Sequence, residues 1–199
     1  RAAAAAVSRD ARTLAALVAS DPDPKVRAVA LAALVRSVPR AQAGAVWQQA
    51  AADPHPGVRR RAAELAPRLG RAAPCRVLVT LLADRDSWVA EAAAFALGEH
   101  PRVSRRALTE LMHAAASHHD PLVREAAVAA LGARGDPATR AAVLAACDDK
   151  PAIRRRAVLA LAAFDGPDVE ARLRAALGDP DWQVRQAAED LLAAPDVTP

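Results

Sequence analysis

Hydrophobic residues recur along this chain with the period of an α-helix, and six segments share one pattern. In each of them an aliphatic residue, which we call the anchor, is followed by alanine four positions later and by leucine or alanine eight positions later. Residues at these spacings lie on one face of a helix, so each segment predicts a helix with a buried face. The six anchors are Val26, Val58, Val89, Val123, Ile153 and Val184.

Consecutive anchors lie 32, 31, 34, 30 and 31 residues apart. A period of this length is typical of stacked helical repeats, in which each unit buries its hydrophobic face against its neighbours. No run of β-branched residues alternates with polar ones, so no strand is predicted. The pattern therefore predicts an all-α solenoid.

The segment around Val123 shows how each anchor helix begins and ends. Asp120 is a favourable N-cap residue, and Pro121 fits the first helical position, where its missing N–H costs nothing. Gly132 and Gly135 are expected to end this helix. A second, less regular helix is expected before each anchor helix, at Thr13–Ala19, Ala43–Ala51, Arg76–Ala83, Arg105–Ala116, Ala138–Ala146 and Asp168–Leu177.

The composition favours thin, closely packed helices and narrows the function only a little. Hydrophobic residues make up 53% of the chain, mostly as alanine, while aromatic residues make up 3%. The formal net charge of +4 allows nucleic-acid binding but argues weakly for it. Cys75 and Cys147 lack the spacing of a disulfide framework, which indicates a reducing cytoplasm. No apolar run approaches the ~18 residues that a membrane span requires.

The turns before the anchors resemble those of the HEAT-repeat family, in particular its short bacterial form, the phycobilisome-lyase-like HEAT repeat. The resemblance is carried by Asp-Pro-Asp-Pro-Lys-Val-Arg at residues 21–27, by residues 53–59, 148–154 and 179–185, and by Asp-Pro-Leu-Val-Arg-Glu-Ala-Ala at residues 120–127. It implies a right-handed α-solenoid of about six helix–turn–helix repeats, forming a single domain over residues 1–199. The expected repeats are residues 10–38, 39–70, 71–100, 101–134, 135–165 and 166–194.

In HEAT proteins an aspartate and an arginine from these turns form a ladder of ion pairs between neighbouring repeats. By this resemblance the ladder aspartates are Asp21, Asp53, Asp84, Asp148 and Asp179. The ladder arginines are Arg27, Arg59, Arg124, Arg154 and Arg185. A stripe of arginines that grips phosphates is the functional alternative for the same residues. His118 and Ala90 replace an aspartate and an arginine, so we expect an interrupted ladder between the third and fourth repeats.

The resemblance also implies that the anchor helices line a concave surface. Helical geometry places positions two, three, six and ten after each anchor on the side away from the core. The side chains expected to bind a partner there are Arg36, Arg60, Arg61, Arg68, Glu91, Phe95, Glu125, Arg155, Arg156 and Leu159. Their charges run basic, acidic, basic and then mixed. This order suits a protein partner better than a nucleic acid, because acidic groups repel phosphates. Phe95 and Leu159 are the expected apolar contacts.

Two clusters contain metal-ligating residue types, at His118-His119-Asp120 and at residues 147–149. Adjacent side chains rarely converge on one ion, so we expect no metal and no cofactor. A bilin lyase, which the name of the repeat suggests, would need a cysteine- or tyrosine-based pocket that the sequence does not indicate.

The three tryptophans keep DNA binding open as the alternative function. Trp88, close to Asp84 and Asp86, resembles the exposed tryptophans of the alkylpurine DNA glycosylases, a group of HEAT-like bacterial enzymes. Acidic residues and Ala90 nearby oppose that function. We expect Trp47, Trp88 and Trp182 to cover edges of the alanine-rich core instead.

The sequence therefore predicts a cytoplasmic scaffold or adaptor without enzymatic activity, whose partner is a protein or a neighbouring domain and not a membrane. The chain begins at Arg1 without methionine, and we interpret Ala2–Val7 as the remnant of a preceding helix. Leu191 and Leu192 close the last helix without a polar cap. Solenoid ends need such caps. We therefore expect an end to be covered by another domain, by a partner protein, or by a second copy of the chain that associates end to end.

Overall fold

The computed structural model describes the backbone of residues 2–193 and the side chains of residues 10–193. Every regular element in this range is helical, which confirms the predicted all-α fold class. The α-helices are α1 (Ala2–Ser20), α2 (Pro24–Ser37), α3 (Arg40–Ala51), α4 (Pro56–Leu69), α5 (Cys75–Leu82), α6 (Ser87–Glu99), α7 (Arg105–Ser117), α8 (Pro121–Arg134), α9 (Arg140–Ala146), α10 (Pro151–Ala160), α11 (Pro167–Ala176) and α12 (Trp182–Ala193). Short 3-10 helices lie at Gly70–Ala72, Pro137–Thr139 and Leu161–Ala163.

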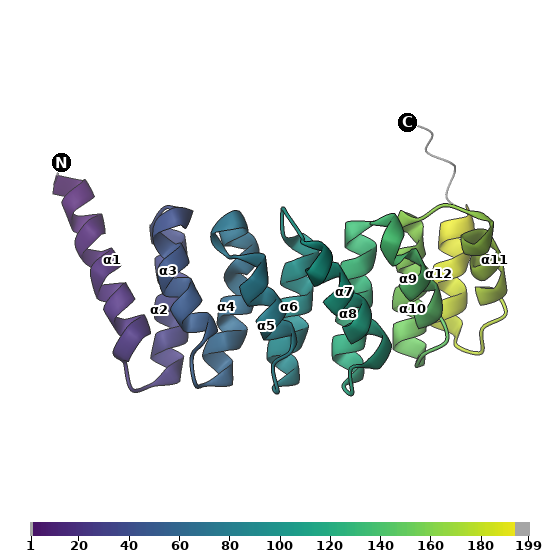
Figure 1. Ribbon diagram of the computed structural model, residues 1–199, viewed down its shortest axis with the longest axis horizontal. Coiled ribbons are helices and arrows are strands. Elements are labelled where there is room, and N and C mark those ends of the chain that lie inside the picture. The colour runs from purple at the N-terminus through teal and green to yellow at the C-terminus, as the bar shows by residue number, and fades with distance from the viewer. Residues whose placement is uncertain (1, 194–199) are drawn as a thin grey trace. The chain divides into compact units, whose positions relative to one another are not determined.

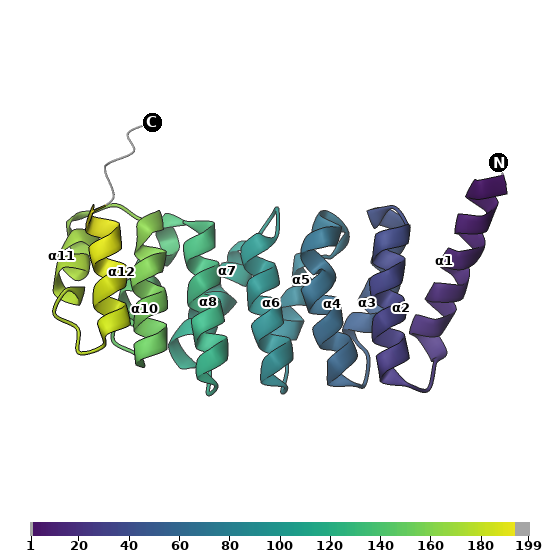
Figure 2. The same ribbon diagram turned by 180° about the vertical axis from the view of Figure 1, so that it is seen from behind.

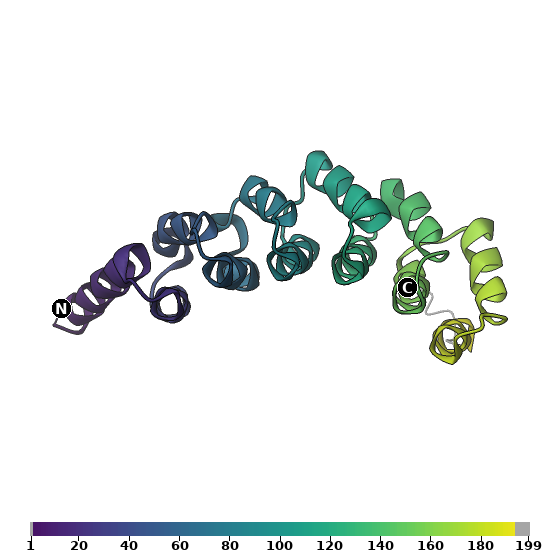
Figure 3. The ribbon, with the colours of Figure 1, turned by 90° about the horizontal axis from the view of Figure 1, so that it is seen from below.

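The chain forms two compact units, Arg1–Ala107 and Leu108–Pro199, which we call unit 1 and unit 2. In unit 1 the anchor helices α2, α4 and α6 lie side by side in one layer (Figure 2), and α1, α3 and α5 form a second layer against them (Figure 3). Each of these anchor helices thus packs on its own preceding helix, and α4 packs on both α2 and α6, as expected for stacked repeats.

Unit 2 repeats this arrangement with its own helices. The anchor helices α8, α10 and α12 pack in sequence, while α9 packs on α8 and α10, and α11 packs on α12 (Figure 1). In each unit the solvent side of the anchor helices forms a surface, which we call the anchor-helix face.

The anchors of the later repeats are buried as the pattern predicts. Val58, Val89, Val123 and Ile153 are fully buried, and the alanines four positions after them are too. Val26 differs, because 37% of it is exposed. Within unit 1, α4 lies between α2 and α6, whereas α2 has an anchor-helix neighbour only in α4. Val184 on α12, which also has a single anchor-helix neighbour, is buried.

Small residues let the helices of unit 2 approach closely. A Cβ atom added to Gly132 on α8 would lie 2.5 Å from the Cβ of Ala160 on α10, inside van der Waals contact. Gly132 therefore lies within the helix as a packing position and does not end it as expected. Gly135 ends α8 instead, with the left-handed φ of 56° that glycine adopts at low cost.

The helix starts follow the predicted cap chemistry. The side chains of Asp23, Asp86 and Asp120 accept hydrogen bonds from backbone N–H groups of the first turns of α2, α6 and α8. His55 does the same through Nδ1 at the start of α4, whereas Lys150 provides no side-chain cap for α10. The segment Ala2–Val7 is no separate helix, since α1 continues through it to Ser20.

Candidate functional site

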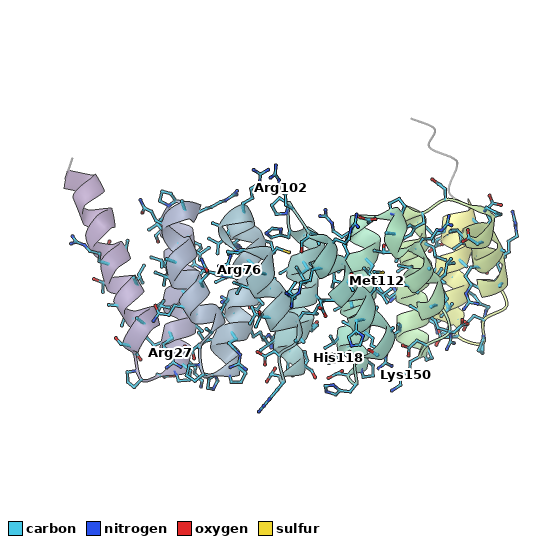
Figure 4. The ribbon with its side chains drawn as sticks, viewed as in Figure 1. Arg27, Arg76, Arg102, Met112, His118 and Lys150 are labelled. Atoms are coloured by element: carbon cyan, nitrogen blue, oxygen red, sulfur yellow. The ribbon has the colours of Figure 1, made fainter. Side chains whose placement is uncertain are left out.

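The ladder arginines of unit 1 each clamp two consecutive turns. Arg27 lies in the first turn of α2 (Figure 4), and its guanidinium donates from Nε and Nη2 to the two carboxylate oxygens of Asp53, both at 2.8 Å. Its Nη1 donates to the backbone carbonyl of Asp21 at 2.9 Å. Arg59 repeats this geometry with the Asp84 carboxylate, at 2.6 and 2.9 Å, and with the Asp53 carbonyl, at 2.8 Å. Each arginine thereby joins its own turn to that of the next repeat.

Burial and hydrogen bonding act in opposite directions on the ladder carboxyl groups of unit 1. Burial raises the pKa of Asp53 and Asp84, but hydrogen bonds from the arginines and from backbone N–H groups outweigh it, so both pKa values lie below the ordinary value. The bonds to the carboxylates also raise the pKa of Arg27 and Arg59. The paired groups therefore stay charged in the folded protein.

Unit 2 contains two further ladder pairs, and one of them differs from the sequence prediction. Arg154 binds Asp179 at 2.8 and 2.7 Å. Arg124 binds Asp149, at 2.7 and 2.9 Å, and not Asp148 as predicted. The Asp148 carboxylate instead pairs with Arg172 on α11. The prediction was wrong by one residue, since Asp149 holds the ladder position and Asp148 pairs with the following helix instead.

The last predicted arginine of the ladder, Arg185, binds only backbone. Its Nη1 donates to the carbonyls of Asp179 and Pro180, at 2.7 and 3.1 Å. The four ladder arginines that bind carboxylates, Arg27, Arg59, Arg124 and Arg154, expose only 12–20% of their side chains. Their donors are used within the protein, which argues against the alternative of a phosphate-gripping stripe.

His118 takes over one of the two roles of a ladder aspartate. Its Nδ1 accepts a hydrogen bond from the Asp120 N–H at 3.1 Å, as the Asp53 carboxylate does from the His55 N–H. The imidazole offers no carboxylate for an arginine. Burial, as the largest effect, lowers the pKa of His118. The residue lies at the turn before α8, and Lys150 lies at the turn before α10 (Figure 4).

On the anchor-helix face of unit 1, aromatic and charged side chains stand next to each other. Phe95 and Trp88 on α6 are 60% and 52% exposed. The Arg60 guanidinium of α4 lies over the Trp88 ring, 5.2 Å from its centroid, a cation–π arrangement. Arg60 and Arg61 both pair with Glu64, each at 2.9 Å. The basic cluster predicted on α4 is thus partly neutralised within its own helix.

The remaining predicted face residues of unit 1 differ in exposure. Arg36 and Arg68 are exposed near the ends of α2 and α4, and Glu91 is half-buried on α6. Glu99, one turn beyond Phe95, is exposed. Glu91 and Glu99 form no ion pair with any residue whose side chain the structure describes.

Unit 2 presents a different set of side chains on its anchor-helix face. Arg156 on α10 lies 3.4 Å from the Glu125 carboxylate on α8, and Arg155 is exposed. Leu159 is half-buried and not outward as expected, so it contributes little apolar surface. Leu122, at the start of α8, is 45% exposed and was not among the predicted face residues. It directly precedes an anchor, the same position that Trp88 holds in unit 1.

The three tryptophans occupy two different environments. Trp47 is fully buried, and its Nε1 donates to the Ala62 carbonyl at 2.6 Å. Trp88 and Trp182 are mostly exposed, at 52% and 64%, and not the covers of the core that we expected. The position of the two exposed tryptophans at helix starts explains this difference, because a first-turn side chain need not reach a neighbouring helix.

Two grooves were not predicted from the sequence. A groove of about 690 Å³ in unit 1 lies along α3 and α5, with Gln48, Arg76 and Thr80 in its lining. A smaller one of about 230 Å³ in unit 2 contains Cys147 and Arg172. Burial raises the pKa of the Cys147 thiol, which opposes a reactive thiolate there.

The part of the chain that the structure describes offers no other recognisable site. No group of three or more potential metal ligands converges among the described residues. Within the same range, none of the helices combines the length and apolar character of a membrane span.

Known structures share this arrangement of stacked helices. An engineered protein superposes with a TM-score of 0.63 at 18% identity, covering 92% of this chain and 95% of that one. A designed armadillo repeat protein in complex with the peptide (KR)4 gives 0.62 at 17%, covering 90% and 97%. A chain of the S. pombe condensin Cnd3–Cnd2 subcomplex gives 0.69 at 16%, covering 92% of this chain and 28% of that one. At these identities the likeness concerns the fold alone.

Sequence comparison identifies the family directly. No curated protein matches the chain. The profile for HEAT repeats matches residues 11–98, 76–153 and 143–194, which together span most of the sequence. The chain therefore belongs to the HEAT-repeat family.

Proposed function

We propose that this protein is an interaction scaffold that binds another protein on its anchor-helix faces. The observation that carries the proposal is the exposure of Phe95 and Trp88 on α6, 60% and 52%, beside the charged residues of α4. Large aromatic side chains flanked by charges are the groups that contribute most to protein interfaces. The binding residues are the ten predicted face residues, from Arg36 to Leu159, of which Phe95 is the main apolar contact.

Two further features support this function. The designed armadillo repeat protein with a similar fold is in complex with a peptide, and helical repeats provide extended surfaces for such partners. Both cysteines are free thiols, as in proteins of a reducing cytoplasm, where we place the scaffold.

DNA binding is the less favoured function for this face. A nucleic-acid groove should be positive along its length, since each contact neutralises a phosphate. Here Glu64 neutralises part of the α4 cluster, and Glu91 and Glu99 add negative charge to α6.

An affinity capture from native lysate, with and without nuclease, tests the proposal. The wild type should capture a protein both with and without nuclease. The triple variant Arg60→Glu, Phe95→Ala, Arg155→Glu should no longer capture it. The matched control Arg71→Glu, Arg85→Glu, Leu177→Ala makes the same types of change at other exposed positions and should retain it. Capture that disappears with nuclease, or that the control loses equally, would contradict the proposal.

A further inference from the structure

The exposed side of α6 carries an apolar group between two carboxylates. Glu91, Phe95 and Glu99 are spaced by four residues, so they follow one another along the same side of the helix. With a rise of about 1.5 Å per residue, the two glutamates are about 12 Å apart along the axis, and Phe95 lies midway. We call these three residues the α6 stripe.

The two carboxylates of the α6 stripe form no ion pair with the neighbouring helix α4. Neither glutamate forms an ion pair with a described side chain. On α4, Arg60 holds the same position after its anchor as Glu91 does on α6, and Arg61 is next to it. Both arginines bind Glu64, and Arg60 also lies over the Trp88 ring. The stripe therefore presents an exposed aromatic ring between two carboxylates that form no ion pair with a described side chain.

We infer that the α6 stripe binds an extended segment of a partner protein in which an apolar side chain lies between two basic ones, in the order basic–x–apolar–x–basic. Opposite charges at the two glutamates would fix the register, and burial of Phe95 would supply affinity. An extended chain rises about 3.3–3.4 Å per residue, so alternate side chains on one face are about 6.7 Å apart. The two basic groups then lie about 13 Å apart, close to the separation of the glutamates.

This inference rests on the proposed function and specifies the chemistry of the partner at one site. Acidic segments and nucleic-acid backbones are repelled by the same two carboxylates. A segment with basic groups but no central apolar residue would leave the Phe95 ring uncovered. The stripe should therefore select for charge and for spacing together.

Selection from a random peptide display library on the immobilised full chain tests the inference. We expect enrichment of peptides with two basic residues four positions apart around a central apolar residue. The variant Glu91→Lys, Glu99→Lys should reverse the preference to acidic residues at the same spacing. The matched variant Asp165→Lys, Glu189→Lys adds the same charge at exposed positions of unit 2 and should enrich the wild-type pattern.

A synthetic peptide with the enriched pattern then gives the size of the effect. Its affinity should fall about tenfold on Glu91→Gln, Glu99→Gln, because each exposed ion pair contributes modestly. Unfolding midpoints of all variants establish that they remain folded. No enrichment, enrichment of another pattern, or a reversal by the control variant would overturn the inference. If one of these results is found but the wild type still captures a protein that Phe95→Ala loses, the inference is wrong and the scaffold function stands. If the wild type also captures no protein from the lysate, both the inference and the scaffold function are wrong.

Discussion

The Arg59 guanidinium holds both carboxylate oxygens of Asp84, at 2.6 and 2.9 Å, although the two residues are 25 positions apart in the chain. The same arginine also binds the Asp53 carbonyl at 2.8 Å, and the Asp53 carboxylate is bound in turn by Arg27. Arginine is suited to this position because its planar fork meets a carboxylate with two parallel hydrogen bonds. These pairs connect the turns of the three repeats in unit 1.

Removing one pair should destabilise unit 1 measurably. Arg59→Ala deletes the bidentate contact and leaves the Asp84 carboxylate half-buried without its partner, and we expect a loss of about 2 kcal/mol in the free energy of unfolding. Arg59→Lys should recover only part of it, since lysine lacks the fork. Chemical denaturation measures both. Arg68→Ala, at an exposed position of the same helix, is the control and should change stability by less than about 0.5 kcal/mol.

The paired carboxyl groups make stability depend on acid. The pKa values of Asp53, Asp84, Asp149 and Asp179 are lower in the folded protein than their ordinary value. The unfolded chain therefore binds more protons in acid, and the stabilisation, complete above pH ~5, is lost as the pH falls through the folded-state pKa values. Denaturation between pH 6 and pH 3 should show this decline. The variant Asp84→Asn should have a lower free energy of unfolding than the wild type at pH 6, and this free energy should decline less steeply towards pH 3. Parallel declines in the two proteins would contradict the role of Asp84 in the acid dependence.

His118 should add a separate dependence nearer neutrality. Its neutral Nδ1 accepts the Asp120 N–H, and burial lowers the pKa of the folded-state imidazole. The contribution of neutral His118 to the free energy of unfolding is therefore fully present above the ordinary histidine pKa of about 6.5, and it is lost as the pH falls through the folded-state pKa. His118→Asn keeps an acceptor that does not titrate. The variant should lose less stability than the wild type between pH 7 and pH 5 in the same denaturation assay, and an equal loss would rule this role out.

Gly132 should not tolerate the smallest side chain. Gly132→Ala places a Cβ 2.5 Å from the Ala160 Cβ, and such overpacking costs about 2 kcal/mol. This exceeds the gain of about 1 kcal/mol from better helix propensity. Thermal unfolding should show a lower midpoint for Gly132→Ala. The double variant with Ala160→Gly should recover only part of the loss, because the added Cβ still lies 2.9 Å from the Cα of residue 160. Gly178→Ala, where the added Cβ meets only the Ala175 carbonyl at 3.6 Å, should be nearly neutral.

Fluorescence should separate the buried tryptophan from the exposed ones. A variant that retains only Trp47, made by Trp88→Phe and Trp182→Phe, should emit at shorter wavelength and resist quenching by acrylamide. Trp47→Phe should leave a signal that acrylamide quenches readily. It should also lower stability by about 1–3 kcal/mol, since a packed ring and its hydrogen bond to Ala62 are lost. Equal quenching of both variants would contradict the described burial.

Much of the fold could be predicted because the same physical requirement recurs in each repeat. A buried anchor and an alanine one turn later must share a helix face, and this spacing is visible without a structure. Cap residues such as Asp86 and Asp120 are equally local, because the side chain bonds a backbone N–H two or three positions away. Predictions of this kind depend only on neighbours in sequence.

The errors arose where a residue from another repeat decides the outcome. Asp148 occupies the ladder position in the sequence, yet Arg172 binds it and Asp149 takes its place opposite Arg124. Val26 fits the anchor pattern but is 37% exposed, a difference that the pattern within its own helix does not reveal. The outward direction of Phe95 followed from helical geometry, whereas the partial burial of Leu159 could not be inferred from its own helix.

The bonded turns of unit 1 all lie at the same ends of the anchor helices, next to Asp53 and Asp84. At this edge hydrogen bonds of 2.6–2.9 Å set the spacing between consecutive repeats. Away from it, the anchor helices touch mainly through alanine and aliphatic side chains, whose contacts are individually weak and non-directional. Under mechanical load we therefore expect the repeats of unit 1 to rotate about the hydrogen-bonded edge and to separate first at the opposite edge.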